Sequence, residues 1–398
     1  MLNVLSLQQA IELSQTIAKR NLSTQILPLS SLPGRVSATD IFCPQDLPGF
    51  CRSTMDGYAV IAADTFGAND SSPSELTVIG EICMGEEAQM TVRHGNCVKI
   101  PTGGMLPKGA DAVIPVEYTD TDFETCLINT AVSPGQYVTK KDDDAKQNEL
   151  LIKAGTRFTP SVIGVLAAAG IIQAEVFVSP KVAVLSTGNE VVPVSDDPPS
   201  GKVRDVNGPL LCALMARYGC ESKYLGIIPD CEEALCFQLS EAAKTYDFVL
   251  LSGGSSAGEK DLTAKVIAKL GKVYAHGVAM KPGKPTVVGT IAGTPVFGLP
   301  GHPAACYFVT ETIVKACVET LTGAPLPCRT TQAVITDNIS SNHGREEFIC
   351  VRLHNGAAEP VYGKSGIVSQ LSRADGYIRV SRDAEGIKKG ETVTVYYI

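Results

Sequence analysis

The sequence predicts a multidomain α/β protein, and three patterns along the chain lead to that fold class. Beyond Pro180, apolar strand-like runs alternate with helical segments, which is typical of a doubly wound α/β domain with a parallel sheet. Within 53–136, short β-rich runs separated by glycine and proline turns predict an all-β insert, either a small barrel or a sandwich. Beyond residue 325, apolar and polar residues alternate, so we expect a small, β-barrel-like C-terminal domain.

The remaining segments are expected to form a mixed helical domain that links these parts. A helix is expected over 6–19, where Ser6 suits the N-cap position, and a second helix is expected after Thr159. Pro160 in its first turn and Gly170 at its end fit the usual start and stop of a helix. The expected domains are residues 1–52 plus 137–178 for the linking domain, 53–136 for the insert, 179–324 for the α/β domain and 325–398 for the C-terminal domain.

Composition and charge argue against several functional classes. With 44% apolar and 19% charged residues, the chain is globular rather than disordered. Its formal net charge of −8 argues against non-specific nucleic-acid binding, so an anionic ligand would need a local group of cations. The longest apolar run, 162–172, is too short to cross a membrane, and the N-terminus has no signal-peptide features. The 13 cysteines include no CxxC motif, so we expect them to be free thiols in a cytoplasmic protein. From the charge and the apolar runs, we expect no nucleic-acid or membrane partner.

Four glycine- or proline-rich loops follow the predicted strands of the α/β domain. In open α/β sheets, ligands bind beyond the carboxyl ends of the strands, and bare backbone N–H groups beside a helix N-terminus can hold phosphate. One such loop is usually an ordinary turn, but four at equivalent strand ends favour a ligand site. The candidate substrate-binding residues in three of these loops are Ser186, Thr187, Gly188, Ser252, Gly253, Gly254, Ser255, Pro300, Gly301 and His302.

Carboxylates accompany these loops. The acidic residues at or just beyond a predicted strand end or helix start are Glu190, Asp205, Asp230 and Asp261. Helix N-capping is the alternative role for Asp205 and Asp261, whereas a Mg²⁺ ion would use one or two carboxylates together with substrate phosphates. No P-loop GxxxxGKS/T and no GxGxxG motif follows these strands, which disfavours ordinary NTPases and dinucleotide-binding enzymes.

Cations occur in the fourth loop and in the C-terminal part. The stretch KPGKP places Lys281 and Lys284 on a turn stiffened by prolines, which suits a small oxyanion, although a solvated basic turn is the alternative. Arg345 precedes a predicted strand, and it could bind an oxyanion through its forked guanidinium or pair with Glu347. Ser365 belongs to a further glycine- and serine-containing loop of the type that binds anions.

Together these motifs resemble the MoeA/gephyrin E-domain family of molybdopterin molybdenumtransferases. The resemblance covers essentially the whole chain, and the number of ordered motifs makes it specific. The motifs are MDGYAV at 55–60, PTGGMLPKGADAVIPVE at 101–117, LSTGNE at 185–190, GIIPD at 226–230, SGGSSAGEKD at 252–261, KPGKP at 281–285, GLPGHP at 298–303 and GREEF at 344–348. Two positions depart from the family pattern: His302 replaces the asparagine of LPGNP, and Val206 replaces the serine of DSN.

The resemblance implies an enzyme of molybdenum cofactor biosynthesis. Such an enzyme inserts molybdate into adenylylated molybdopterin and releases AMP, and it requires Mg²⁺. The resemblance also implies an elongated homodimer, with each active cleft between the α/β domain of one subunit and the β insert of the other. Molybdopterin adenylyltransferase and the apoproteins or chaperones of molybdenum enzymes are candidate partners. Two alternatives stay open: a non-enzymatic, gephyrin-like scaffold, and a molybdopterin adenylyltransferase, which the α/β domain also resembles.

The resemblance also implies roles for individual residues. Carboxylates are expected to stay with the metal and away from the oxyanion. The residues that resemble the family's molybdate pocket are Lys281, Lys284, Pro285, Arg345 and Ser365. The expected catalytic residues are Asp56 in the stretch STMDGYAV, Thr102, Glu190, Asp230 and Asp261, of which the last three are the expected metal ligands. Asp205 is expected to bind substrate together with the loop residues named above.

Overall fold

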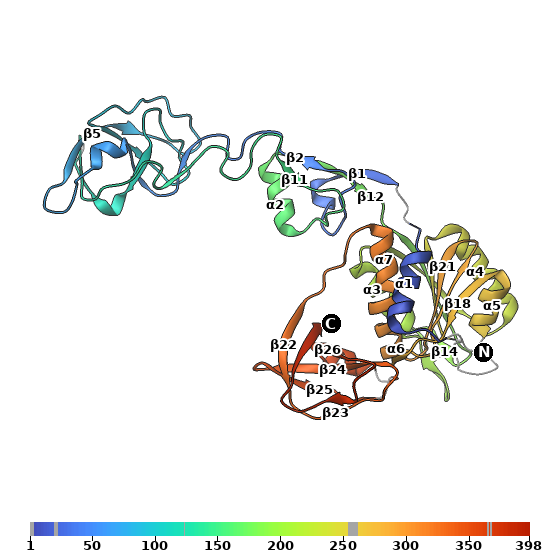
Figure 1. Ribbon diagram of the computed structural model, residues 1–398. Coiled ribbons are helices and arrows are strands. Elements are labelled where there is room, and N and C mark those ends of the chain that lie inside the picture. The colour runs from blue at the N-terminus through green and yellow to red at the C-terminus, as the bar shows by residue number, and fades with distance from the viewer. Residues whose placement is uncertain (1–3, 20–22, 123, 254–261, 364–365, 367) are drawn as a thin grey trace. The chain divides into compact units, whose positions relative to one another are not determined.

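The computed structural model describes residues 4–19, 23–122, 124–253, 262–363, 366 and 368–398, and the chain forms two compact units (Figure 1). The first unit comprises Met1–Ile26, Gly34–Ala38 and Glu175–Ile398, and the second comprises Leu27–Pro33 and Thr39–Ala174. The chain passes between the units within β1 (Thr24–Pro28) and β12 (Gln173–Phe177). The four domain boundaries expected from the sequence remain a prediction.

A six-stranded sheet forms the centre of the first unit. In spatial order its strands are β16 (Glu221–Ile228), β13 (Lys181–Thr187), β17 (Phe248–Ser252), β21 (Thr294–Leu299), β20 (Val287–Ile291) and β18 (Gly271–His276). The first four are parallel, as predicted, but β20 and β18 run antiparallel to their neighbours. The expectation of a parallel sheet is wrong for these two strands, because a two-residue turn of Ala292 and Gly293, both with positive φ, joins β20 directly to β21.

Alternate residues of these strands pack against helices on the two faces of the sheet (Figure 1). Val182 and Val184 of β13 face one helical layer, and Ala183 and Leu185 face the other. The first layer consists of α1 (Leu7–Ile17), α3 (Asn207–Arg217), α6 (Pro303–Val309) and α7 (Lys315–Thr322), and the second consists of α4 (Glu232–Thr245) and α5 (Leu262–Leu270). This is the doubly wound arrangement that the sequence predicts.

The first helix packs on this sheet, although the sequence analysis grouped it with the linking domain. Ser6 caps α1 through a reciprocal capping box with Gln9, as its position in the sequence predicts. The Ser14 hydroxyl donates to the backbone carbonyl of Ile313 (2.6 Å), which lies in the π-helical turn η4 (Thr310–Val314) between α6 and α7. The buried side chain of Leu7 joins the same core, so the apolar face of α1 covers the sheet rather than a separate domain.

Five strands near the C-terminus close into a small barrel, as the alternation predicts. The barrel strands are β22 (Thr330–Ile335), β24 (Glu346–His354), β25 (Ala357–Pro360), β26 (Gly376–Val380) and β28 (Thr392–Tyr397). The ring closes because β24 pairs with both β25 and β26. A further short strand, β19 (Met280–Lys281), comes from the α/β part of the chain and pairs in parallel with β24.

The second unit contains the all-β insert that the sequence predicts. Its six strands, in spatial order, are β7 (Ala112–Pro115), β4 (Gly57–Val60), β6 (Asn96–Ile100), β5 (Ser74–Glu81), β9 (Thr125–Ile128) and β8 (Thr119–Thr121). A Cβ atom at Gly57 would lie 1.8 Å from the carbonyl oxygen of Ile114. Only glycine therefore permits β4 to approach β7 at this point, which accounts for the glycine of the MDG motif.

The rest of the second unit carries the helix α2 (Pro160–Ala168). Thr159 accepts a hydrogen bond from the N–H of Val162 and Gly170 ends the helix with a φ of 72°, as predicted. Two short antiparallel pairs join β2 (Ile41–Phe42) to β11 (Leu150–Ile152) and β3 (Arg52–Ser53) to β10 (Val138–Thr139). Within the described ranges, no helix is long and apolar enough to cross a membrane.

Candidate functional site

Three loops meet at the carboxyl ends of β13, β17 and β21. The N–H of Gly253 donates to the carbonyl of Leu299 (3.1 Å), and a Cβ atom on Gly253 would lie 2.0 Å from the carbonyl oxygen of Thr187. A Cβ atom on Gly301 would lie 3.8 Å from the Cα of Gly253. The backbones can approach this closely only because residue 253 is glycine. The loops that follow β13, β17 and β21, three of the four predicted from the sequence, therefore lie in contact. The predicted residues Gly254, Ser255, Asp261 and Ser365 lie outside the described residues.

Asn207, at the start of α3, forms hydrogen bonds with two of these loops. Its Nδ2 donates to the Ser252 hydroxyl (2.7 Å) and to the carbonyl of Gly301 (2.8 Å). The side chain is almost fully buried, so these bonds form away from competing water. Asn207 was not among the predicted site residues, although its position two residues after Asp205 was an available signal.

Asp205 is buried, and its carboxylate is satisfied by neighbouring groups. It accepts hydrogen bonds from the hydroxyls of Tyr224 (2.5 Å) and Ser186 (2.8 Å) and from the N–H of Gly208 (3.1 Å). Burial, and then the hydrogen bond to Asp205, raise the pKa of Tyr224, so this phenol stays protonated as a donor. The bond to Gly208 is the helix-capping role that the sequence left open, and the bond to Ser186 fixes the end of β13.

Two exposed carboxylates border the loop that follows β13. Asp230 accepts hydrogen bonds from the Thr187 hydroxyl (2.5 Å) and from the N–H of Asn189 (3.2 Å). Glu190 lies on the same loop, with Oε1 2.8 Å from the position that a Cβ of Gly188 would occupy. No group of three or more His, Cys, Asp or Glu side chains suited to a metal occurs among the residues that the structure describes. Two accessible carboxylates nevertheless fit Mg²⁺, which takes few protein ligands and completes its shell with phosphate oxygens and water.

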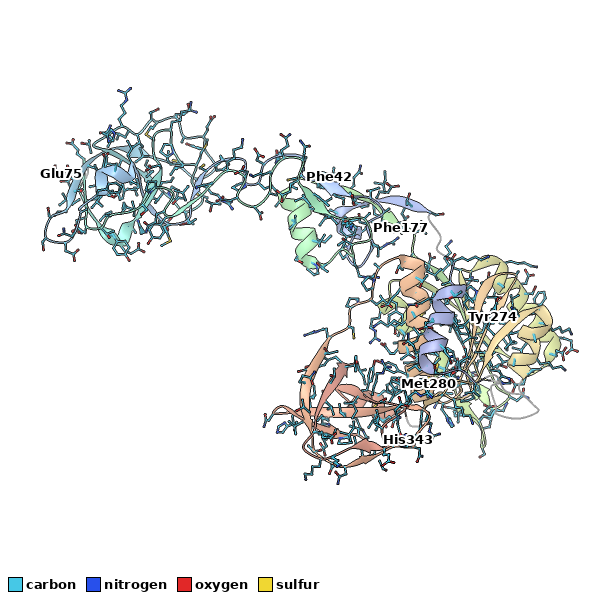
Figure 2. The ribbon with its side chains drawn as sticks, viewed as in Figure 1. Phe42, Glu75, Phe177, Tyr274, Met280 and His343 are labelled. Carbon is cyan, nitrogen blue, oxygen red and sulfur yellow. The ribbon has the colours of Figure 1, made fainter. Side chains whose placement is uncertain are left out.

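A cavity of about 670 Å³ lies between the strand-end loops and the barrel. Figure 2 labels Met280, which lines this cavity, and His343, which lines a smaller neighbouring cavity of about 330 Å³ that Met280 also borders. The structure thus brings together the predicted cavity residues Lys281, Lys284, Pro285, Pro300, His302 and Arg345. His302 directly precedes α6, so the residue that departs from the LPGNP pattern faces the same cavity as the cations.

The KPGKP turn is held firmly against the core. Gly283 has a φ of 126°, and a Cβ atom there would lie 2.8 Å from Val309, so glycine is required for this packing. The Thr286 hydroxyl donates to the carbonyl of Gly283 (2.7 Å), and strand β19, just before the turn, is paired to the barrel. The exposed side chain of Lys284 therefore projects from a backbone fixed on both sides.

A carboxylate lies inside this cavity, contrary to the expectation that carboxylates stay away from the oxyanion. Glu347 is 8% exposed, and its Oε1 forms an ion pair with Lys281 Nζ (2.5 Å). The Ser341 hydroxyl donates to its other oxygen (3.0 Å). The suggested pairing of Glu347 with Arg345 is wrong, because β19 brings Lys281 beside Glu347 in register. Arg345 and Lys284 form no ion pair with any described residue, so their charges remain available to a ligand.

In the second unit, the two predicted insert residues lie side by side. The backbone N–H of Thr102 donates to Asp56 Oδ1 (2.7 Å). This bond, followed by one from the Thr102 side chain, lowers the pKa of Asp56. Asp56 is therefore a turn residue and also an exposed, ionised carboxylate, so its structural contact leaves it free to act on a ligand.

Fold and site together define a multidomain α/β protein whose strand-end loops and cationic cavity can hold anionic ligands. Three family models match successive parts of the chain: the MoeA N-terminal region (domain I and II) over residues 5–170, a probable molybdopterin binding domain over 183–320, and the MoeA C-terminal region (domain IV) over 332–398. These matches follow the order of the parts described above. The chain belongs to the MoeA family.

Similar proteins extend over nearly the whole chain. Molybdopterin molybdenumtransferase of Bacillus subtilis is 32% identical over 388 residues, which is 94% of this chain and 90% of the relative. The protein of the same name from a Nostoc species is 33% identical over 337 residues, covering 83% of this chain and 77% of the relative. The solved structure of a molybdopterin biosynthesis MoeA protein from Pyrococcus horikoshii has a TM-score of 0.88 at 31% identity, covering 99% of this chain and 100% of that one.

Proposed function

We propose that this protein is a molybdopterin molybdenumtransferase that inserts molybdate into adenylylated molybdopterin and releases AMP. The observation that carries the proposal is the cavity with Lys281, Lys284 and Arg345 on its wall, next to glycine-rich strand-end loops. Cations suit a tetrahedral dianion, and bare backbone at strand ends suits phosphate. The two anionic substrates would therefore meet within the first unit.

Asp230 and Glu190 would hold Mg²⁺ at the nucleotide end, with Asp261 as a third candidate ligand. Asp230 is already oriented by Thr187 and Asn189, so its free lone pairs point in a fixed direction. Bound Mg²⁺ would neutralise charge on the phosphoanhydride of the substrate. In the homodimer proposed below, Asp56 and Thr102 of a second copy of the chain, hydrogen-bonded to each other, would supply a further carboxylate and hydroxyl to the reaction.

The two alternative functions are less well supported. A scaffold does not need exposed carboxylates together with cavity cations that form no ion pair with a described residue, whereas this chain carries both. A molybdopterin adenylyltransferase would need only the α/β domain, whereas the family models match the insert and the C-terminal barrel as well. The relatives from Bacillus subtilis and Nostoc are named as transferases, which also favours the enzyme.

A homodimer forms part of the proposal. Helix α2 is apolar on most of its surface, with Leu166 buried while Val165 is 38% exposed, and Ile172 beyond its end is 76% exposed. An apolar surface of this kind suits a second copy of the chain. Val165→Glu should convert the protein to a monomer in light-scattering measurements, and Val334→Glu, at an exposed valine of the barrel, should leave the mass unchanged.

The cellular setting follows from the same reasoning. All 13 cysteines are free thiols in the structure, which supports a reducing compartment, and we place the protein in the cytoplasm. Candidate partners are the molybdopterin adenylyltransferase that would deliver the adenylylated substrate, and the apoproteins or chaperones that would accept the finished cofactor.

The decisive experiment is a release assay. Purified protein is mixed with adenylylated molybdopterin, molybdate and Mg²⁺, and AMP is measured with time. We expect AMP release that depends on both molybdate and Mg²⁺. Release that is independent of molybdate would favour a hydrolase, and conversion of unmodified molybdopterin with ATP would favour the adenylyltransferase; either result would contradict the proposal.

A further inference from the structure

The buried Glu347 has no role in the function proposed so far. Among the charged groups that line the large cavity in the described part of the chain, Lys281, Lys284 and Arg345 are cations and Glu347 is the one carboxylate. An anion site would ordinarily exclude a carboxylate, because like charges close together in a partly buried cavity repel strongly. Its place there therefore calls for a physical explanation.

The surroundings of Glu347 show that its position is built into the fold. β19 and β24 are paired so that Lys281 lies opposite Glu347, and the ion pair follows directly from this register. Ser341 holds the second carboxylate oxygen, so the side chain stays in place if Lys281 leaves. Lys281, by contrast, is about half exposed and can turn towards the cavity.

We propose that Glu347 is an internal counter-ion that competes with the oxyanion for Lys281 and so limits how tightly the cavity holds its anion. The inference rests on the proposed function of the cavity as an oxyanion site. Without an anion, the carboxylate neutralises Lys281, while Lys284 and Arg345 keep their charge. An incoming oxyanion must attract Lys281 away from a fixed carboxylate, so part of the binding free energy is lost. A site that must hand its oxyanion on to a second substrate benefits from such moderate affinity.

The test compares molybdate with perrhenate, a tetrahedral oxyanion with a single negative charge. Binding to the full-length protein is measured by titration calorimetry for the wild type and for Glu347→Gln. Glutamine keeps the shape: its oxygen can accept from Lys281 and its amide N–H can donate to the Ser341 hydroxyl, but it lacks the charge. We expect molybdate to bind about tenfold more tightly to the variant, and perrhenate about threefold, because the gain scales with anion charge.

The neighbouring residue provides a matched control. Glu346 forms an ion pair with Arg379 (2.5 Å) and does not line the cavity, so Glu346→Gln should leave both affinities unchanged. If Glu347 only maintained the shape of the cavity, Glu347→Gln would weaken both anions by a similar factor. Weaker or unchanged molybdate binding would therefore overturn the inference.

A second pair of variants tests the inference if Glu347→Gln folds poorly. Lys281→Gln leaves the carboxylate in the cavity without its ion-pair partner and should weaken molybdate binding about tenfold or more. The double variant Lys281→Gln with Glu347→Gln removes the competing carboxylate as well and should regain part of the affinity that Lys281→Gln loses. Failure of the double variant to recover would contradict the competition. A wild-type protein that binds neither oxyanion would instead refute the proposed function together with the inference.

Discussion

The strand-end loops and the cationic cavity belong to the same unit but are built in opposite ways. At the strand ends, hydrogen bonds link the side chains to their neighbours: Asp205 accepts three hydrogen bonds, and the Asn207 amide donates to two loops, although its buried Oδ1 accepts none from the described residues. In the cavity, Lys284 and Arg345 form no ion pair with any residue in the described ranges. The difference shows that hydrogen bonds between side chains fix the geometry of the backbone. Attraction for an anion instead requires cations that are not already neutralised by an ion pair.

The largest effect on turnover is expected at Asp56. This residue shares features of both regions, because its carboxylate is hydrogen-bonded and still charged. Asp56→Asn keeps an oxygen for the N–H of Thr102, so the fold should persist, but turnover should fall by about 100-fold or more. AMP release and circular dichroism measure the two properties. Asp122→Asn is the control, since Asp122 forms a similar turn with Glu124 and Thr125 elsewhere in the insert. Equal loss of folding in both variants would point to a purely structural Asp56.

Arg345→Gln tests the cavity side of the comparison. Arg345 forms no ion pair with any described residue, and its removal should weaken molybdate binding about 10- to 100-fold, because a forked, charge-assisted contact is lost. AMP binding should be unaffected, since the strand-end loops are hydrogen-bonded among themselves. Calorimetry with each ligand separates the two effects. Arg352→Gln, on the strand β24 that follows Arg345 but outside the cavity, is the control, and a loss of AMP affinity in Arg345→Gln would contradict the division between the regions.

Asp205→Asn tests the hydrogen bonds at the strand-end loops. Tyr224 and Ser186 donate to one carboxylate oxygen and the N–H of Gly208 donates to the other, so an amide, which has a single acceptor oxygen, leaves at least one of these donors without its partner. We expect the free energy of unfolding to fall by about 2 kcal/mol, as measured in urea. Asp196→Asn, at an exposed residue that pairs only with Ser195 among the described residues, should change it little. An unchanged stability in Asp205→Asn would mean that the network does not hold the loops.

The smallest effect, on thermal stability, is expected for an exposed ion pair at the start of α4. Lys265 and then Lys269 lower the pKa of Glu232 to about 2. The lowered pKa means that the folded state favours the ionised form. This stabilisation is present above the ordinary value of about 4.3 and is lost as the pH falls towards 2. Glu232→Gln should lower the melting temperature slightly at neutral pH and low salt, and the difference should vanish in 1 M salt and near pH 2. A difference that persists in high salt would show that Glu232 acts by packing.

Local signals in the sequence predicted much of the fold. Ser6 and Thr159 mark helix starts because their side chains bind the first free N–H groups, and that interaction involves only neighbouring residues. The antiparallel edge of the sheet was not predicted, because a turn as short as that of Ala292 and Gly293 can be recognised only once both flanking runs are known to be strands of one sheet. Periodicity shows that a strand exists but not its direction.

The candidate site was predicted as a set of residues but not as a set of contacts. Lys281, Lys284 and Arg345 were identified from motif and charge, and the structure places them around one cavity. The pairing of Lys281 with Glu347 spans 66 positions in the chain and depends on the register of β19 with β24, which no local pattern specifies. Asn207 was missed for the same reason, since its two partners come from distant loops.

The pairing of β19 with β24 also has a consequence for protein engineering. A chimera that takes only the C-terminal barrel from a relative would place a foreign strand beside Met280 and Lys281. The exchangeable module is therefore larger than the barrel itself and must include these two residues and the turn that follows them. Recombination libraries with crossovers on the N-terminal side of Met280 should yield functional hybrids more often than libraries that join the parts at the linker near residue 325.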